Sequence, residues 1–404
     1  MMSPQSLAQI AAKLQGYDPQ ALEVEGVLKF LSELVTPIVE IEEIDIFQSL
    51  QRVVAEDVIC PIHVPPHDNS AMDGYAFNGA QLDSPHSLKL KVIGTALAGK
   101  AWSGDIQIGE CVKIMTGAIM PAGLDTVAPQ EICTLSADSS SVMLPKGALQ
   151  RGDNRRLRGE DLTQGLPALM KGQIITPAAA GLLASLGLAK VKVYRKLKVA
   201  YFSTGDEILS LGEAPREGAV YDSNRYTVHG LLQQLGCEMI DMGVVKDDPA
   251  LLEQAFIQAA QSADAVITSG GVSVGEADFT KAMMKKLGDV AFWKIAMRPG
   301  RPMAVGRLHH GDRYAILFGL PGNPVAVMVT FLAFVKPALL QMMGSTAKAL
   351  PLVRARTQEV LRKKPGRTEY QRGIVTVAQD GQLQVRTTGN QGSGVLSSMV
   401  QANG

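Results

Sequence analysis

The stretch AVITSGGVSVGEAD, residues 265–278, decides the fold of this chain. Its first four residues form a short apolar run that predicts a buried strand at 265–268. A glycine-rich loop follows, and Asp278 is a good N-cap for a helix over 279–287. A strand, a loop and a helix in this order are the repeating unit of parallel α/β sheets.

The same alternation extends to both sides of this stretch. Helices are predicted after Asp222, with Gly236 as the stop signal, then over 251–260 and from Pro324 onward. Further strands are predicted at 197–202, 239–245, 290–296, 303–305 and 314–318. The pattern predicts a doubly wound, mostly parallel sheet, whose ligands bind outside the carboxyl ends of the strands.

The regions on either side of this α/β segment show a different pattern of apolar, charged and turn residues. From Val27 to about Gln150, short apolar runs such as 88–93 and 111–115 alternate with turn residues, which predicts a β-rich region. The run 38–46 is equally compatible with helix and strand. The charged stretch 151–164 is either a solvated hinge or a functional segment. Alternation returns in 351–404 and predicts a small β domain.

Composition excludes several classes of protein. The 404 residues carry 39 basic and 39 acidic side chains, so no overall charge favours nucleic acid as a partner. Four cysteines without paired spacing argue against a zinc site or disulfides and favour the reducing cytoplasm. The uncharged stretches 315–335 and 172–189 are broken by proline and glycine, which favours buried core over membrane spans.

Two loops at predicted strand ends are candidates for phosphate binding. One is 204–207, and the other is the loop 269–278, whose Gly270, Gly271 and Gly275 permit close backbone approach to an anion. Ser273 adds a hydroxyl donor, and the carboxylates of Glu207 and Asp278 are suited to Mg²⁺ that bridges substrate phosphates. The alternative is a tight turn followed by a helix cap. No Gly-Lys-Ser/Thr sequence follows, so the loop is not a Walker A motif.

A group of cations and a proline-rich turn follow. Lys294, Arg298 and Arg301 fall within eight positions and are able to converge on an oxyanion, or else line a solvated edge. The turn Pro321-Gly322-Asn323-Pro324 marks another junction of strand and helix. In isolation it is best interpreted as a tight turn with Pro324 at the first helical position.

Six motifs in order resemble those of a known family. They are HDNSAMDGYA at 67–76, MTGA at 115–118, RGED at 158–161, STGDE at 203–207, the 269–278 loop, and LPGNP at 320–324. Together they resemble the molybdopterin molybdenumtransferases (MoeA), the family that includes the C-terminal domain of gephyrin. The resemblance covers about Val27 to Gly404, while nothing in 1–22 is diagnostic.

The resemblance implies a multidomain α/β architecture around the molybdopterin-binding fold. Expected parts are an N-terminal extension at 1–22, an elongated arm of 23–60 with 152–176, an inserted β-rich domain at 61–151, the α/β domain at 177–345, and a C-terminal β domain at 346–404. Relatives usually continue past the final Ala-Asn-Gly, so the last domain is expected to be incomplete or truncated.

The resemblance also implies a reaction: adenylylated molybdopterin and molybdate give molybdenum cofactor and AMP, with a divalent metal such as Mg²⁺. The family's active-site positions correspond to Asp68, Thr116, Asp161, Glu207, Asp247, Asp278, Lys294, Arg298, Pro321 and Pro324. Arg298 departs from the lysine of many relatives, which replaces a point charge by a planar fork. Substrate sulfurs, rather than cysteines, are expected to ligate molybdenum, since no cysteine lies in a motif.

Two other functions remain open at this stage. One is a pterin adenylyltransferase on the same fold, since a fold alone does not set function. The other is a gephyrin-like scaffold without catalysis. We also expect a homodimer with shared active sites, in which the charged stretch 151–164 suits a connecting arm.

Overall fold

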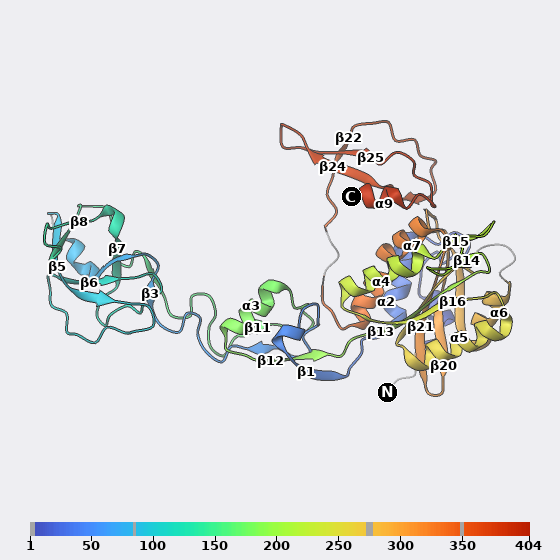
Figure 1. Cartoon of the computed structure of the whole chain (residues 1–404), viewed down its shortest axis with the longest axis horizontal. Coiled ribbons are helices and arrows are strands. Elements are labelled where there is room, and N and C mark those ends of the chain that lie inside the picture. The colour runs from blue at the N-terminus through green and yellow to red at the C-terminus, as the bar shows by residue number, and fades with distance from the viewer. Residues whose placement is uncertain (1–4, 84–85, 272–277, 348–350) are drawn as a thin grey trace. The chain divides into compact units, whose positions relative to one another are not determined.

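The computed structural model describes residues 5–83, 86–271, 278–347 and 351–404. The chain divides into two compact units. Figure 1 traces the chain from the N-terminus in blue to the C-terminus in red. Unit 1 comprises Met1–Glu56, Lys171–Thr176 and Val191–Gly404, and unit 2 comprises Asp57–Met170 and Pro177–Lys190. The five-part division expected from the sequence stays a prediction.

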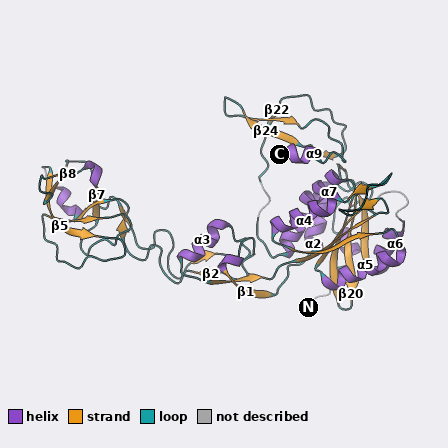
Figure 2. Ribbon diagram, viewed as in Figure 1, coloured by secondary structure: helices purple, strands orange, loops and turns teal. Residues whose placement is uncertain are grey.

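A six-stranded sheet forms the centre of unit 1 (Figure 2). Its order is β16 (Glu238–Val245), β13 (Lys198–Thr204), β17 (Ala265–Ser269), β21 (Arg313–Leu320), β20 (Pro302–His310) and β18 (Gly288–Lys294). The first four strands are parallel, while β20 runs antiparallel to both β21 and β18. The predicted doubly wound, mostly parallel sheet is confirmed.

Helices cover both faces of this sheet. Successive side chains of β13 point to opposite faces and so enter two different cores. Val199 and Tyr201 enter a core shared with α4 (Ser223–Leu235), α7 (Pro324–Thr330) and α8 (Lys336–Met342). Ala200 and Phe202 enter the other core, where Phe202 packs edge-to-face on Phe256 of α5 (Pro249–Ser262) at 5.1 Å between ring centroids. Helix α6 (Asp278–Leu287) contacts α5.

The helices begin and end at the capping residues that their sequences contain. Asp222 accepts a hydrogen bond from the Arg225 N–H at the start of α4, and Gly236 ends this helix in the left-handed conformation. Asp248 caps α5 in the same way. Helix α6 begins at Asp278 itself, one residue earlier than the sequence predicted.

Two N-terminal helices complete the core of unit 1. These are α1 (Leu7–Ala12) and α2 (Val24–Leu34), and the first lies in the segment 1–22, where no diagnostic signal was found. Phe30 packs edge-to-face on Trp293 at 4.9 Å, and the Trp293 indole N–H donates to the Tyr17 hydroxyl at 2.9 Å. Arg307 donates to the Leu34 carbonyl at 3.0 Å. The N-terminal segment is therefore part of the α/β core.

The apolar helix at 324–342 is long and apolar enough to cross a membrane, judged by length and composition. It comprises α7, a π-helical turn η4 (Phe331–Val335) and α8. The side chains of Phe331, Phe334 and Leu339 are fully buried against the sheet core. It is thus a core helix, as the sequence analysis expected.

Unit 2 is built around a second six-stranded sheet. Its order is β7 (Thr126–Pro129), β4 (Gly74–Phe77), β6 (Glu110–Ile114), β5 (Leu88–Ala96), β9 (Ser141–Leu144) and β8 (Thr134–Leu135). Short strand pairs join β3 (Asn69–Ser70) to β10 (Arg155–Arg156) and β2 (Val58–Ile59) to β11 (Pro167–Leu169), and α3 (Pro177–Ser185) follows. The predicted β-rich region is confirmed.

The remaining elements belong to unit 1. Within the ambiguous run 38–46, residues 41–45 form the strand β1 (Ile41–Asp45), which pairs with β12 (Lys190–Tyr194), while Ile46 begins the 3-10 turn η1 (Ile46–Gln48). Near the C-terminus, β22 (Arg356–Thr357), β24 (Gly373–Val377) and β25 (Leu383–Thr387) form a small sheet, and α9 (Ser397–Gln401) follows. Two further pairs join β14 (Ile208–Leu209) to β15 (Val220–Tyr221) and β19 (Met297–Arg298) to β23 (Thr368–Glu369).

Candidate functional site

The carboxyl ends of the parallel strands in unit 1 bring the predicted loops together. Strands β13, β17 and β21 end at Thr204, Ser269 and Leu320. The Gly270 N–H donates to the Leu320 carbonyl at 3.2 Å, so the glycine loop is tied directly to the 320–324 turn. That amide is therefore engaged with the sheet, and the phosphate-binding role of the glycine loop stays a prediction.

The two glycines of this loop have no room for a side chain. At Gly270, where φ is +96°, a Cβ atom would lie 2.5 Å from the Thr204 carbonyl oxygen. At Gly271, where φ is +67°, a Cβ atom would lie 2.7 Å from the Thr280 side chain. Glycine is needed here because the backbone is left-handed and closely packed on its neighbours.

Three buried hydroxyls form a ring beneath these strand ends. The Tyr201 hydroxyl lies 2.7 Å from Ser269 Oγ and 2.9 Å from Ser203 Oγ, and the two serine oxygens are 3.2 Å apart. Burial raises the pKa of Tyr201, so the phenol stays protonated. The ring fixes the ends of β13 and β17 relative to each other.

Several buried polar atoms at this edge have no partner among the described residues. They are Thr204 Oγ1, Asn224 Oδ1 and Asp222 Oδ2. Asn224 lies against the predicted proline turn, because its Nδ2 donates to the Gly322 carbonyl at 2.8 Å. Unpartnered buried polar atoms are costly unless a ligand or water completes them. They are the observation at this edge that most directly indicates a polar ligand.

Acidic side chains gather beside the same loops. The Asp247 N–H donates to Asp206 Oδ1 at 3.3 Å, and the Glu207 carboxylate folds back over Gly205. Burial, together with the charges of Asp206 and Glu207, raises the pKa of Asp247. Within the described ranges, no three His, Cys, Asp or Glu side chains are close enough to hold one metal ion by themselves. Mg²⁺ fits here only with substrate phosphates as additional ligands, which is its usual mode of binding.

The predicted cations lie at the same edge of the sheet. Lys294 ends β18, which is antiparallel to β20 and therefore runs in the direction of β21. The Ile295 N–H donates to the Arg301 carbonyl at 2.7 Å, which closes the loop between them. A Cβ atom on Gly300 would lie 2.5 Å from Thr330 of α7, so the loop packs on the helix that Pro324 opens. Lys294 is half-buried, while Arg298 and Arg301 are exposed.

Unit 2 holds a second group of predicted site residues. Asp68 accepts a hydrogen bond from the Arg158 N–H at 2.8 Å and lies 3.6 Å from Arg155 Nη1. Its carbonyl accepts the Met120 N–H at 2.9 Å. The 67–76, 115–118 and 158–161 motifs are therefore neighbours within this unit, although they are far apart in sequence.

Thr116 is held by an acidic residue that the sequence analysis did not single out. The backbone N–H and the hydroxyl of Thr116 both donate to Asp73 Oδ1, each at 2.7 Å. These bonds lower the pKa of Asp73, with the backbone N–H as the larger cause. Asp161 is exposed, and its N–H donates to the Val64 carbonyl at 3.1 Å.

Some predicted positions lie outside the described residues. Ser273 and Gly275 are among them, and only the backbone of Asp278 is described. The metal-binding role of Asp278 thus stays a prediction.

The structure adds residues near the site that carried no sequence signal. Asp222 and Asn224 were visible only as the start of a helix. The Ser393 carbonyl accepts the Val325 N–H at 3.0 Å, which places the 389–393 loop at the start of α7. Arg372 is buried next to this loop, donates to the Gly392 carbonyl at 3.0 Å, and has an unpartnered Nη1.

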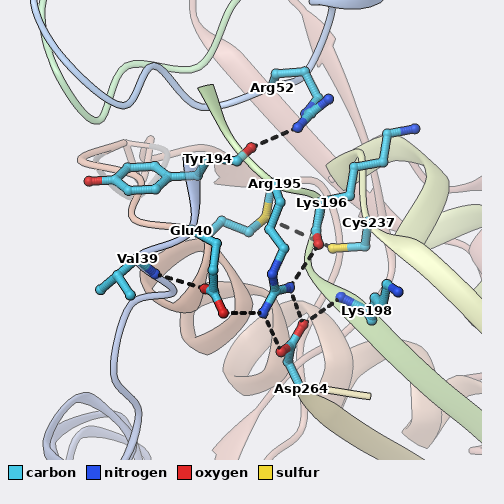
Figure 3. A network of polar contacts seen from close by, with 10 residues as sticks. Val39, Glu40, Arg52, Tyr194, Arg195, Lys196, Lys198, Cys237 and Asp264 are labelled. Carbon is cyan, nitrogen blue, oxygen red and sulfur yellow. Dashed lines mark hydrogen bonds and ion pairs between the residues drawn. The ribbon is translucent and has the colours of Figure 1, made fainter. Parts of the chain in front are cut away.

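The opposite edge of the sheet carries a polar network of a different kind (Figure 3). Arg195 makes two hydrogen bonds to Asp264, at 2.7 and 2.8 Å, and reaches Glu40 at 3.5 Å. The Lys198 N–H also donates to Asp264. Every carboxylate oxygen of Asp264 is engaged, so this network connects the start of β17 to the end of the β12 segment.

The cysteines of the chain take no part in the described site. All four are free thiols, and Cys60, Cys111 and Cys237 are buried. Burial raises the pKa of both Cys111 and Cys237 to about 12. Protonated, buried thiols are poor metal ligands.

Comparison with known proteins covers almost the whole chain. Residues 22–187 match the model of the MoeA N-terminal region (domain I and II), 200–341 match a probable molybdopterin binding domain, and 354–404 match the MoeA C-terminal region (domain IV). The chain is 44% identical to the molybdopterin molybdenumtransferase of Haemophilus influenzae over 93% of this chain and 91% of the relative. It is 34% identical to that of Bacillus subtilis, over 90% and 85%.

Solved structures agree with this match. The molybdopterin biosynthesis protein MoeA of Pyrococcus horikoshii is similar with a TM-score of 0.76 and 27% identity, covering 95% of this chain and 94% of that one. A second structure of the protein from this organism gives a TM-score of 0.69 at 30% identity, with the same coverage.

Proposed function

Because this chain belongs to the MoeA family of molybdopterin molybdenumtransferases, we propose that it acts on adenylylated molybdopterin and molybdate and releases AMP. The chain is a transferase of the molybdenum-insertion step in molybdenum cofactor biosynthesis. The adenylylated form of the pterin, molybdate and AMP are our proposal. It rests chiefly on the unpartnered polar atoms of Thr204 at the end of β13 and of Asp222 and Asn224 at the start of α4.

The first task of the site is to bind and orient a diphosphate. The glycine loop provides a close surface, and the unpartnered Thr204 and Asn224 oxygens accept hydrogen bonds from hydroxyl or amino groups of the substrate. When the diphosphate is hydrolysed, a water oxygen forms a new P–O bond as the bridging P–O bond breaks, which leaves AMP and the phosphate ester of the pterin with additional negative charge. Catalysis of this class of reaction is mostly positioning and charge neutralisation.

We propose that a divalent metal binds beside the acidic side chains at this edge. Burial, followed by the charges of Asp206 and Glu207, raises the pKa of Asp247, so negative charge is concentrated at this edge. Mg²⁺ held by these carboxylates and by Asp278 would neutralise charge on the phosphate oxygens. The cations Lys294 and Arg298 lie at the same edge and attract molybdate, which is a dianion. Buried, protonated thiols leave the dithiolene of the substrate as the sulfur ligand of molybdenum.

We further propose a homodimer with shared active sites. Asp68, Thr116 and Asp161 belong to unit 2, while Glu207 and Lys294 belong to unit 1. Apolar side chains that favour a partner are exposed in unit 1, including Phe47 at 100% and Val39 at 77%. The free cysteines support a reducing, cytoplasmic location.

One assay tests the reaction. The protein is incubated with adenylylated molybdopterin and Mg²⁺, with and without molybdate, and AMP is quantified. We expect AMP release that depends on molybdate and is lost on chelation of the metal. Lys294→Ala should raise the molybdate concentration for half-maximal release, while Arg313→Ala, an exposed cation at the opposite sheet edge, should not. AMP release that ignores molybdate would refute the proposal.

Subunit exchange tests the shared site. Asp68→Ala and Glu207→Ala remove groups from different units, and each variant alone should be inactive. A mixture that exchanges subunits should regain activity, because one site per mixed dimer then holds both wild-type residues. Heterodimers without activity would exclude the shared arrangement.

A further inference from the structure

A cation-lined pocket of about 590 Å³ lies where the C-terminal segment meets strand β19 (Met297–Arg298). Its volume falls within the range of small-molecule binding sites. Its charged lining residues are Arg298, Arg362, Lys363, Lys364, Arg367 and Glu369. Five of these six side chains are basic, so the pocket is strongly positive in a chain whose net charge is zero.

The positive charge of this pocket is not compensated within the described part of the chain. No ion pair joins any of its five cations to an acid there. The one acid, Glu369, accepts a hydrogen bond from Gln371 Nε2 at 3.1 Å, so its carboxylate is partly engaged elsewhere. Like charges around one concavity repel each other, and a bound anion relieves this repulsion.

Backbone pairing holds the walls of the pocket in place. Arg298 lies opposite Glu369 in the β19–β23 pair. The Thr368 N–H donates to the Ala296 carbonyl and the Tyr370 N–H to the Arg298 carbonyl, both at 2.9 Å. A charged run on one exposed loop is ordinarily just solvated. In this pocket Arg298, which lies on strand β19, lines the same concavity as the basic run at 362–367. The hydrogen bonds between the backbones of β19 and β23 hold Arg298 next to this run.

The lining also indicates what kind of anion fits. Apart from Pro365, it contains no apolar residue, and it contains no aromatic ring on which a purine or pterin would stack. The pocket therefore suits the phosphate of a larger ligand better than its ring system. Arginine and lysine together match the charge and the hydrogen-bond acceptors of a phosphate ester.

We propose that this pocket is a subsite for a phosphate ester, and that during the reaction it holds the phosphate on the pterin side of the substrate. The assignment to the substrate rests on the proposed function. Arg298 belongs both to the pocket and to the loop that carries the predicted oxyanion cations, so the pocket adjoins that site directly. The phosphate ester retained after AMP leaves would be held here while the dithiolene receives molybdenum.

A binding experiment without turnover tests the subsite. The triple variant Lys363→Gln, Lys364→Gln, Arg367→Gln removes three pocket cations and leaves Arg298 in place. The matched control, Lys89→Gln, Lys100→Gln, Lys146→Gln, removes three exposed lysines of unit 2. Inorganic pyrophosphate is titrated into each protein by calorimetry at low and high salt. We expect at least tenfold weaker binding for the triple variant only, and weaker wild-type binding at high salt. Equal affinities in all three proteins would overturn the inference.

Steady-state kinetics distinguish whether the pocket holds the phosphate of the substrate or free phosphate. If the substrate uses the pocket, the triple variant raises KM for adenylylated molybdopterin at least tenfold, while the control variant leaves it unchanged. Weaker pyrophosphate binding with an unchanged KM would refute the substrate assignment and leave a site for free phosphate. If wild-type protein binds pyrophosphate through the pocket but releases no AMP, the proposed reaction fails and the subsite stands.

Discussion

Replacing Gly270 by alanine should destabilise unit 1 and displace the loop on which the proposed site depends. The left-handed backbone at this residue costs a side chain about 1–2 kcal/mol. The new Cβ would also lie 2.5 Å from the Thr204 carbonyl oxygen, and relieving such a contact adds about 1–3 kcal/mol. A total near 3 kcal/mol corresponds to a drop in Tm of roughly 6–12 °C for a domain of this size.

Tryptophan fluorescence can follow the thermal unfolding of unit 1 separately from that of unit 2. The chain has two tryptophans, and Trp293 is fully buried in unit 1 while Trp102 belongs to unit 2. In a Trp102→Phe background, thermal unfolding monitored by tryptophan emission reports unit 1. The control is Gly230→Ala within α4, where a Cβ meets nothing within 4 Å and should stabilise the helix by up to about 1 kcal/mol. Unchanged melting of the Gly270→Ala protein would refute the packing argument.

Three further predictions concern charged groups. Asp264→Asn removes the charge that Arg195 pairs with, and because both side chains are mostly buried we expect a loss of about 2 kcal/mol in urea unfolding. Asp247→Asn should increase the free energy of unfolding at neutral pH, because the raised pKa of Asp247 means that folding disfavours its ionised form. This increase should vanish as the pH falls below 3.8, the usual pKa of the group, where the carboxyl is protonated in both states. Thr116→Val keeps the N–H but removes the hydroxyl donor, so the pKa of Asp73 should rise part of the way to its usual value in an NMR titration.

Each of these predictions has a control. Glu56→Gln breaks the exposed pair with Lys192, so a loss as large as that of Asp264→Asn would contradict the burial argument. For Asp247, a gain that persists at low pH would show that charge is not its cause. For Asp73, Thr134→Val is the comparison, since Thr134 is an exposed threonine of β8 in the same unit, and equal pKa values of Asp73 in both variants would exclude the Thr116 hydroxyl.

Local signals explain why much of the fold was predictable. The apolar runs of the sheet, the Asp222 cap and the Gly236 stop depend on neighbours within a few residues, and all were confirmed. The loops at the strand ends followed from the rule that parallel strands end at one edge. Arrangements between distant residues were not predictable in this way. Within the run 38–46, residues 41–45 form a strand by pairing with β12, which is distant in sequence.

In the candidate site, too, features with a local sequence signal were predictable, and contacts between distant residues were not. Its glycines and many of its charged residues were visible as motifs, but the ring of Tyr201, Ser203 and Ser269 was not, because three separate hydroxyls carry no spacing signal. The acceptor role of Asp73 was hidden for the same reason, since its partner Thr116 lies 43 residues away. The cation-lined pocket joins Arg298 to the 362–367 loop, which no local pattern connects.

The packing of the N-terminal helices has a consequence for synthesis on the ribosome. Tyr17 meets Trp293 across 276 residues, and the Ile38 N–H donates to the Met342 carbonyl. The apolar face of the segment 7–38 is therefore covered only after residues 293–342 have been made. Unit 2 has all its strands by residue 170 and can fold in the meantime. Until the 290–342 region is made, α2 exposes Phe30 and Leu34, and a chaperone that binds apolar segments would have its longest opportunity there.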